Sequence, residues 1–322
     1  MLSGMVYSLQ APFYPKEAEN HHLYASQYGF VFGTFEIASF LIAPFCGRFI
    51  NSIGPKFMTG AGLLMTGAST LIFGIMDKIE DGNLFFISCM ACRVIEAMGQ
   101  SAATTAIMTI IAHEFYDKTG LVISWTETFY GVGMMIGPAI GGFLFDLGGY
   151  LLPFLVVGCC LLINIPVSRI IIPSDEVLQK NLSDHQTDLS LLKVLKKPLI
   201  WIALATNSVG AISCTFLQPT LEHHLRPFHL SWSWVGFIFL LNGMGYAASN
   251  PLWGKLCDKG VSPVKSMLLG VIMIVVAFSL IGPLPFLAAE PNLGMIILGL
   301  IISGFGIGAE FVPSFIHMKQ VR

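Results

Sequence analysis

A series of apolar stretches constrains this chain of 322 residues more than any other feature. Each stretch is about 20 residues long, enough to cross a hydrocarbon core about 30 Å thick as a helix. Only 11% of the residues are charged, whereas a soluble domain carries roughly a quarter. The sequence therefore predicts an all-α, multi-pass membrane protein. Nine full spans are expected, at approximately 28–50, 57–76, 84–112, 121–146, 150–172, 199–221, 233–253, 265–287 and 293–313.

The remaining segments organise these spans into two groups. Residues 1–15 are apolar but too short to cross a bilayer, so we interpret them as the second half of a further span. No signal peptide is expected, since no basic stretch and cleavage site begin the chain. Residues 173–198 form the long polar connection. We expect an N-terminal helical half at 1–172, a linker at 173–198 and an incomplete C-terminal half at 199–322.

The distribution of Lys and Arg predicts the orientation, because basic residues accumulate in cytoplasmic loops. The acidic loops on the other side contain only Lys16, Lys78 and Arg226. The linker is therefore predicted to be cytoplasmic, and no basic block suggests a nucleic-acid partner. The basic residues assigned to the cytoplasmic side are Arg48, Lys56, Lys118, Arg169, Lys180, Lys193, Lys196, Lys197, Lys255, Lys259, Lys265, Lys319 and Arg322.

An internal repeat relates the two halves. The segment Pro44–Asn51 matches Pro251–Asp258 at an offset of 207 residues, and each segment precedes a short basic loop. Leu9-Gln10 resembles Leu217-Gln218 at an offset of 208 residues. Many transporters consist of two copies of one helical unit. We therefore predict two parallel halves.

The first copy of the loop has the pattern G-x-x-x-[D]-x-x-G-x-[RK], formed by Gly47, Asn51, Gly54 and Lys56. It resembles the signature between helices 2 and 3 of the major facilitator superfamily. The resemblance implies two six-helix halves, here without the start of helix 1 and without helices 11 and 12. It also implies cytoplasmic contacts that break on inward opening, although Asn51 replaces the usual Asp. A tight polar turn with basic anchors is the alternative.

The second copy of the loop retains the acid. It contains Gly254, Lys255 and Asp258, so the resemblance implies that the charge contact is kept in this half of the chain.

A glycine pattern occupies the span at 121–146. Gly133, Gly137 and Gly141 recur every four residues on one helix face, and Pro138 and Gly142 complete a G-x-x-x-G-P-x-x-G-G pattern. Small residues at this spacing let two helices approach closely in lipid. The pattern resembles the antiporter motif of the superfamily, and simple helix packing is the alternative. Residues 242–249 are the expected partner surface.

Charged residues inside membrane spans are rare, costly and usually functional. Arg93 and Glu96 are spaced i, i+3 near the centre of one span, close enough to pair. Arg93 and the following Gly99 also resemble a helix 4 motif of the superfamily. Two interpretations stay open: the pair couples protons to transport, or it is a static structural pair.

Three further carboxylates lie within the predicted spans. Glu127 has no adjacent cation in the sequence. Since a buried carboxylate without a partner is costly in its charged form, it can exchange a proton for a substrate ammonium. A carboxylate satisfied by a neighbouring helix is the alternative. Glu36 is similarly central, and Glu310 is expected near a solvated cytoplasmic end.

Other chemistries are not indicated. Six of the seven cysteines fall within predicted spans, so a disulfide framework is not expected. The pairs His21-His22 and His223-His224 lack the spacing of a metal site. No motif of an intramembrane enzyme is present. We expect neither a cofactor, a metal nor an enzyme activity.

The segments Tyr7–Glu19, Glu127–Phe129 and Phe216–Leu221 together resemble the vesicular amine transporter family, most closely its polyamine branch. The resemblance implies proton-driven uptake of an organic cation, a polyamine or a monoamine, into acidic vesicles. It places Gln10 and Gln218 in the site. Relatives carry an acid where this chain has Gln218, and Glu222 is one turn away as a substitute.

Alternative functions stay open at this point. The chain is expected to be an incomplete transporter, so one alternative is a short isoform that regulates the full-length protein without transporting. A multidrug or organic-cation exporter is another. A vesicular or other acidic-compartment membrane is the expected location, with the plasma membrane as the alternative.

Overall fold

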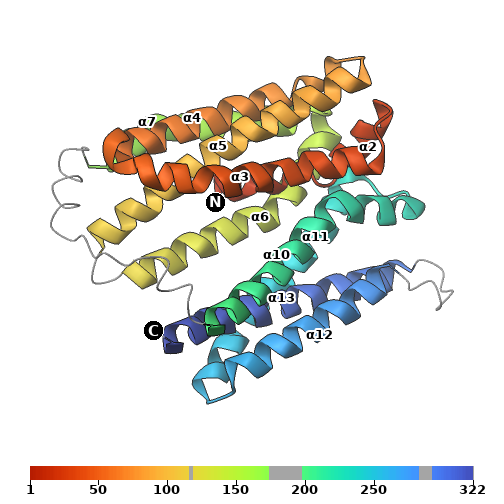
Figure 1. Cartoon of the computed structure of the whole chain (residues 1–322). Helices are drawn as coiled ribbons and strands as arrows, with labels where there is room; N and C mark the ends of the chain where they lie inside the picture. Colours follow the sequence, from red (N-terminus) through yellow and green to blue (C-terminus); the bar gives the residue numbers. More distant parts are fainter. Residues whose placement is uncertain (116–118, 174–197, 283–291, 322) are drawn as a thin grey trace. The chain divides into compact units, whose positions relative to one another are not determined.

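The computed structural model describes residues 1–115, 119–173, 198–282 and 292–321 (Figure 1). The described part contains eleven α-helices and no strand. Within these helices some side chains are not described, including those of Glu127 and Asp258. The chain divides into two compact units, unit 1 (Met1–Thr187) and unit 2 (Asp188–Arg322).

The helices of both units correspond closely to the predicted spans. Unit 1 contains α1 (Leu2–Ser8), α2 (Tyr14–Asn20), α3 (Ala25–Ile53), α4 (Pro55–Phe73), the 3-10 turn η1 (Met76–Lys78), α5 (Gly82–Glu114), α6 (Thr119–Gly148) and α7 (Leu151–Ile171). Unit 2 contains α10 (Pro198–Leu225), the 3-10 turn η3 (Arg226–Phe228), α11 (Trp232–Asp258), α12 (Pro263–Ile281) and α13 (Leu293–Val321).

Proline and glycine set several helix boundaries. Pro12 has no N–H to donate to the carbonyl of Ser8, and α1 ends at Ser8. Gly54 lies between α3 and α4 with a φ of 93°, a conformation that favours glycine, and Pro55 then starts α4. The repeated loop therefore reverses the chain at a fixed point.

Seven of the described helices are long and apolar enough to cross a membrane: α3, α4, α5, α6, α7, α12 and α13. We predicted nine full spans, and the two others correspond to α10 and α11, with 28 and 27 residues. Polar residues such as Asn207, Asn242 and Asn250 interrupt the apolar sequence of these two helices.

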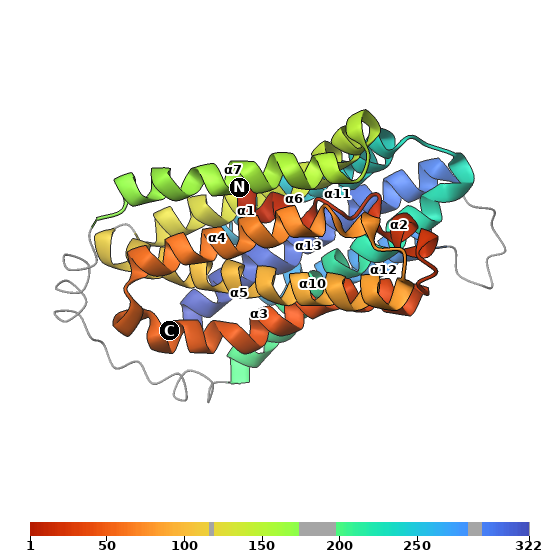
Figure 2. The same ribbon diagram turned by 90° about the horizontal axis from the view of Figure 1, so that it is seen from above.

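In unit 1, α5 packs against α3 and α4, α4 also packs against α7, and α1 packs against α6 (Figure 2). Glycine permits the tightest of these contacts. A Cβ on Gly62 of α4 would lie 2.6 Å from the carbonyl oxygen of Gly99 in α5, and a Cβ on Gly99 would lie 2.7 Å from that of Gly62. The two backbones therefore touch at a point that no larger residue allows.

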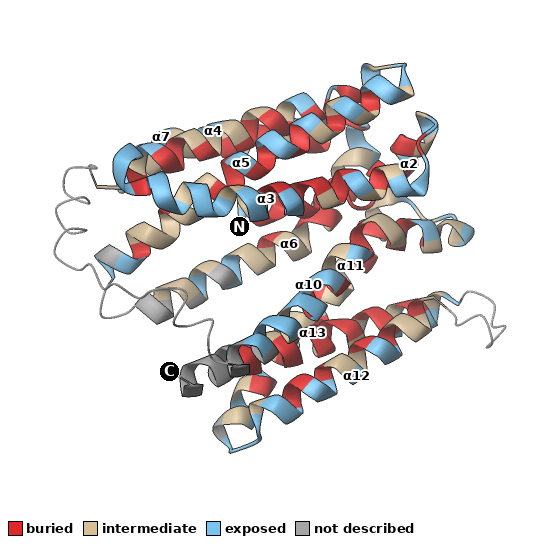
Figure 3. Ribbon diagram, in the orientation of Figure 1, coloured by how far each residue is buried: buried red, intermediate tan, exposed pale blue. Residues whose placement is uncertain are grey.

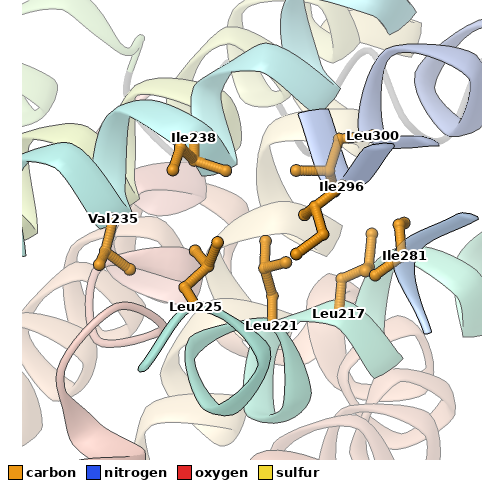
Figure 4. Close-up of a cluster of buried hydrophobic side chains, with 8 residues drawn as sticks. All are labelled: Leu217, Leu221, Leu225, Val235, Ile238, Ile281, Ile296 and Leu300. Carbon is orange, nitrogen blue, oxygen red and sulfur yellow. The ribbon is translucent and has the colours of Figure 1, made fainter. Parts of the chain in front are cut away.

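In unit 2, α13 packs against α10, α11 and α12. One end of this unit holds an apolar cluster drawn from all four helices, shown in Figure 4: Leu217, Leu221, Leu225, Val235, Ile238, Ile281, Ile296 and Leu300. Gly270 of α12 and Gly306 of α13 make the same kind of contact. A Cβ on Gly270 would lie 2.7 Å from the Gly306 carbonyl oxygen, and a Cβ on Gly306 would lie 2.9 Å from that of Gly270.

Many large apolar residues of the helices are exposed. Figure 3 colours the exposed residues pale blue. Phe40 of α3 is 79% exposed and Ile170 of α7 is 85% exposed. A soluble protein rarely exposes a continuous apolar surface, whereas a lipid-facing surface requires one. Charged residues such as Arg93, Glu96 and Glu310 are buried, while these large apolar residues are exposed, as a lipid-facing surface requires.

Candidate functional site

The centre of unit 1 contains a buried ion pair. Arg93 and Glu96 of α5 have side chains 1% and 3% exposed. The Arg93 Nη1 donates to both carboxylate oxygens of Glu96, at 2.9 and 3.0 Å. The predicted i, i+3 pairing is therefore present. Two opposite charges removed from water in this way are retained only with a close partner.

Three phenylalanine rings surround the Arg93 guanidinium. Its central carbon lies 5.6 to 5.8 Å from the ring centroids of Phe32, Phe35 and Phe73. Rings at this distance stabilise a desolvated cation. The Nε of Arg93 has no hydrogen-bond partner among the described residues. The rings and Glu96 thus hold this cation in a dry site.

Glu36 of α3 was expected to be central in its span like Glu127, but the residue is exposed, and its carboxylate has a partner. Its Oε1 accepts a hydrogen bond of 2.5 Å from the hydroxyl of Tyr7, which joins α3 to α1. The Tyr7 ring also contacts Phe35, at 5.3 Å between ring centroids. Phe35 therefore contacts both Arg93 and Tyr7, so that Glu36 and the ion pair belong to one connected region.

The glycine face of α6 packs against α1. A Cβ on Gly133 would lie 2.0 Å from the Met1 carbonyl oxygen, one on Gly137 would lie 2.8 Å from that of Met5, and one on Gly141 would lie 2.1 Å from that of Leu9. Pro138 lies within α6 and is buried, as is Gly142. The predicted close approach of a helix to this face is present, and α1 is the helix.

The partner surface that we expected at 242–249 has other contacts. A Cβ on Gly245 would lie 2.7 Å from the Ile301 carbonyl oxygen of α13. The Asn242 amide donates to the Leu300 carbonyl of the same helix, at 3.0 Å. Each glycine-rich face is thus covered by a helix of its own unit, because the small residues of α11 match the small residues of α13.

The loop motif of unit 1 contacts the end of another helix. The Lys56 Nζ donates to the carbonyl of Ile172, at 2.6 Å, where α7 ends. A cation at this position complements the negative end of the helix dipole. Asn51 and Gly47 lie on the exposed end of α3. In unit 2, Gly254 and Lys255 lie near the end of α11, and the Asp258 side chain lies outside the described residues.

Unit 2 contains a buried carboxylate that the sequence pattern placed in solvent. Glu310 of α13 is 0% exposed, because α10 and α12 pack against it. It does not lie at the helix end, since α13 continues to Val321. Neither carboxylate oxygen has a hydrogen-bond partner among the described residues. A Cβ on Gly210 of α10 would lie 2.6 Å from its Oε2.

Polar groups of two helices lie one turn from Glu310. The Ser314 hydroxyl donates to the Asn207 Oδ1, at 2.8 Å, which joins α13 to α10. Gly210 and Asn207 are spaced i, i+3 on α10 and therefore share a face. The sequence signal for this region was the polar residue Asn207 in an apolar stretch, facing an acid on a later span.

The structure describes the three polar residues that the resemblance placed in or near the substrate site, two in α10 and one, Gln10, in unit 1. Gln218 is buried. Glu222 is paired with Arg226, at 2.6 and 2.8 Å, so that a substrate cation would have to compete with Arg226 for this carboxylate. Gln10 of unit 1 is 1% exposed, and its Nε2 has no hydrogen-bond partner among the described residues.

The structure describes only some of the other residues singled out in the sequence, namely Glu127, the histidine pairs and the cysteines. Glu127 lies in α6, and its side chain is outside the described residues. His21 lies 3.5 Å from Glu17, and the Nδ1 of His224 lies 2.9 Å from the Thr220 carbonyl oxygen. Within the described part of the chain, no group of His, Cys, Asp or Glu could hold a metal ion. The seven cysteines form no disulfide in that part either.

Seven helices that are long and apolar enough to cross a membrane, arranged in two helical units, define a multi-pass membrane protein. The model of the Major Facilitator Superfamily matches residues 1–319, and the chain belongs to this superfamily.

Known proteins resemble the chain along most of its length. It is 36% identical to the human MFS-type transporter SLC18B1 over 318 residues, which are 97% of this chain and 68% of that protein. It is 25% identical to the human synaptic vesicular amine transporter over 285 residues, 88% of this chain and 51% of that protein.

A solved structure has the same fold. A bacterial homologue of the human lysosomal transporter Spinster, in an inward-facing and occupied conformation, superimposes with a TM-score of 0.69. The match covers 98% of this chain and 70% of that chain at 15% identity. The predicted fold class is therefore confirmed.

Proposed function

We propose that this chain is a proton-coupled antiporter of organic cations, such as polyamines or monoamines, in the membrane of an acidic vesicle. The similarity to a synaptic vesicular amine transporter supports an amine substrate and a vesicular membrane. The buried charges support the coupling to protons. The proposal rests on one observation: the carboxyl group of Glu310 is buried without a partner among the described residues.

Glu310 is suited to exchange one positive charge for another. It is fully buried, and both of its oxygens lack a hydrogen bond among the described residues. An ionised carboxylate without a partner is too costly to keep in such a place, so the group requires a proton or a cation. Alternate occupation of one carboxyl by these two species is antiport.

Two of the carboxylates of unit 1, those of Glu96 and Glu36, have partners already. Glu96 is bound by Arg93, and Glu36 accepts from Tyr7. We propose that Glu96 and Glu36 shape the transport path of unit 1, together with Gln10, and that Gln218 lines the path of unit 2. We propose Glu127 as a second exchange site, on the sequence argument alone.

We propose that residues 1–172 and 199–322 act as the two moving halves, joined by a cytoplasmic linker at 173–198. The contact between Lys56 and the end of α7 is then a cytoplasmic contact within the first half. The close packing of α1 on the glycine face of α6 keeps that half rigid while it moves.

Uptake of labelled spermidine into proteoliposomes with an acidic interior tests the proposal. The wild-type chain is expected to accumulate spermidine only while the pH gradient lasts, and Glu310→Gln is expected to lose this accumulation. Glu114→Gln is the matched control, because Glu114 is an exposed glutamate at the end of α5.

Two outcomes would reject the proposal. Gradient-driven uptake by Glu310→Gln at the wild-type rate would remove the exchange role of Glu310. A folded wild-type chain that binds spermidine but never accumulates it would favour the regulatory alternative over transport.

A further inference from the structure

Three oxygen atoms at one end of unit 1 are buried, and no nitrogen or oxygen of the described residues donates a hydrogen bond to them. They are the hydroxyl oxygens of Tyr14 and Tyr150 and the Oδ1 of Asp77. The Tyr14 hydroxyl lies beside the Cys89 thiol, to which it can donate its proton, so that its oxygen stays open as an acceptor. Tyr14 is 0% exposed and Tyr150 is 6% exposed. Buried polar atoms of a native protein are nearly always satisfied, so that a group of unsatisfied ones indicates a missing ligand or water.

Packing brings these residues together although they come from distant parts of the sequence. The Tyr14 ring lies 5.4 Å from the Phe73 ring, and the Phe73 ring lies 5.2 Å from the Phe154 ring. The Phe154 ring in turn lies 5.1 Å from the Tyr150 ring. Phe73 is the last residue of α4, and Asp77 follows in η1.

A tight backbone contact fixes the same end. A Cβ on Gly74 would lie 2.7 Å from the Cβ of Phe154, so that the end of α4 rests directly on the start of α7. The turn before α7 contains Tyr150, and η1 contains Asp77. The two residues are therefore held on adjoining segments.

The electrostatics of this end favour a cation. Burial raises the pKa of the Tyr150 phenol well above its usual range, and the nearby Cys89, Tyr14, Glu17 and Asp77 raise it further. Tyr150 therefore stays a neutral hydroxyl, and it lies within reach of two carboxylates. The nearby buried cation, Arg93, is already neutralised by Glu96.

Glu17 contributes charge rather than a free acceptor. Its Oε2 accepts from the Asn20 amide, at 3.2 Å, and its Oε1 lies 3.5 Å from His21. Within the described residues, Asp77 thus supplies the carboxylate oxygen that remains open to a ligand.

The set of groups matches an ammonium ion better than a metal ion. A primary ammonium has three N–H donors, and the described residues of this end offer three oxygen acceptors without a donor. The rings of Phe73 and Phe154 add aromatic surface, which is used to recognise ammonium groups. Calcium requires six to eight oxygen ligands, and the described residues hold no cluster of metal ligands.

We propose that Tyr14, Tyr150 and Asp77 bind the primary ammonium group of an organic cation at this end of unit 1, as a second site apart from Glu310. The acidic loops place this end on the non-cytoplasmic side. The site rests on the proposed function, because it deepens the choice of substrate: it favours an amine with a free NH3+ group over a quaternary ammonium.

Thermal unfolding of the purified full chain in detergent tests the site, with methylammonium as the probe. Methylammonium is expected to raise the unfolding temperature of the wild-type chain. Tetramethylammonium is expected to have little effect, since it has no N–H donor. Sodium is also expected to have little effect, since three oxygens leave much of its coordination shell unfilled.

The matched variant is Tyr14→Phe/Tyr150→Phe, which removes only two hydroxyl groups. It is expected to weaken methylammonium binding about tenfold or more, since each lost hydrogen bond involved a charged group. Without ligand, it is expected to unfold at the wild-type temperature or above, because it removes unsatisfied buried atoms. Tyr24→Phe is the control, since Tyr24 is 76% exposed at the same end. Asp77→Asn is a second variant that keeps the shape.

Several results would overturn the site. Equal stabilisation by sodium or tetramethylammonium would indicate a nonspecific cation effect. No stabilisation by methylammonium would indicate that only water fills the group, and wild-type affinity in both variants would exclude the named residues. Failure of the proposed function looks different: Glu310→Gln would keep its uptake while methylammonium binding still depended on the tyrosines.

Discussion

Replacing Glu96 with Leu is the sharpest test of how unit 1 is held together. The change leaves the Arg93 guanidinium in a site that is 1% exposed, with its partner at 2.9 Å removed. Arginine keeps its charge in proteins, so it cannot escape the cost by losing a proton. Removing one member of a buried pair costs about 3–5 kcal/mol.

The phenylalanine rings reduce this cost. Phe32, Phe35 and Phe73 remain within 5.8 Å of the guanidinium carbon. Together we expect them to retain about 1 kcal/mol of stabilisation, since desolvated cation–π contacts reach about 2 kcal/mol each and the rings share one cation. The expected net loss for Glu96→Leu is then about 2–4 kcal/mol.

The double variant Arg93→Met/Glu96→Leu removes both charges and keeps most of the volume. We expect it to recover to within about 1 kcal/mol of the wild-type stability, because apolar replacement of a buried pair is often neutral. Chemical unfolding of the wild type, both single variants and the double variant in detergent completes the cycle. Wild-type stability of Glu96→Leu, or a double variant as unstable as the single one, would refute the reasoning.

The same variants separate the two interpretations of the pair. A folded double variant that still transports spermidine indicates a structural pair. A folded double variant without uptake indicates that the charges take part in transport.

Two further predictions concern helix contacts. In Gly137→Val, the new Cβ would lie 2.3 Å from the Ser8 hydroxyl oxygen. We expect this overpacking to lower the free energy of unfolding by about 1–3 kcal/mol, measured by thermal unfolding. Gly29→Ala, with no atom within 4 Å of the new Cβ, should match the wild type, and equal losses would contradict the packing argument. Lys56→Met removes the bond to Ile172 and should cost about 0.3–1 kcal/mol, as a charge at a helix end does. Lys56→Arg should retain most of this stabilisation, because it keeps the positive charge. A loss of stability as large as that of Lys56→Met would show that the charge at the helix end is not the cause.

Much of the fold could be predicted because apolar length and glycine spacing are local signals. Each predicted full span has a helix where the structure describes it, for example Ala25–Ile53 for the span at 28–50. The largest difference is at α13, which ends at Val321 rather than at 313. The ion pair of Arg93 and Glu96 was also predictable, since its two members are three residues apart on one helix.

The misplaced residues depend on contacts between helices that are far apart in sequence. Glu310 was expected in solvent because the apolar run ends soon after it, whereas α13 continues and α10 covers the carboxyl. Glu222 looked available because its partner Arg226 was assigned to the loop rather than to the next helical turn. Neither local pattern nor composition shows which helix covers a given face.

The repeat makes the difference between the two units informative. At the offset of 207 residues, Gly99 corresponds to Gly306, and both make the close contact between neighbouring helices. At the same offset, Arg93 and Glu96 correspond to Leu300 and Ser303, while Glu310 corresponds to Ala103. The two units therefore share a scaffold but carry their buried carboxylates seven residues apart on equivalent helices, about 10 Å along the axis.

Glu96 of unit 1 has its cation, Arg93, built in, and Glu310 of unit 2 has none among the described residues. Since an unpaired buried charge must be neutralised from outside the protein, we propose Glu310 rather than Glu96 as a group for which a proton and a substrate cation compete. The asymmetry predicts that Glu310→Ala gives a folded chain without antiport, measured as the loss of gradient-driven spermidine uptake, whereas uptake at the wild-type rate would contradict it.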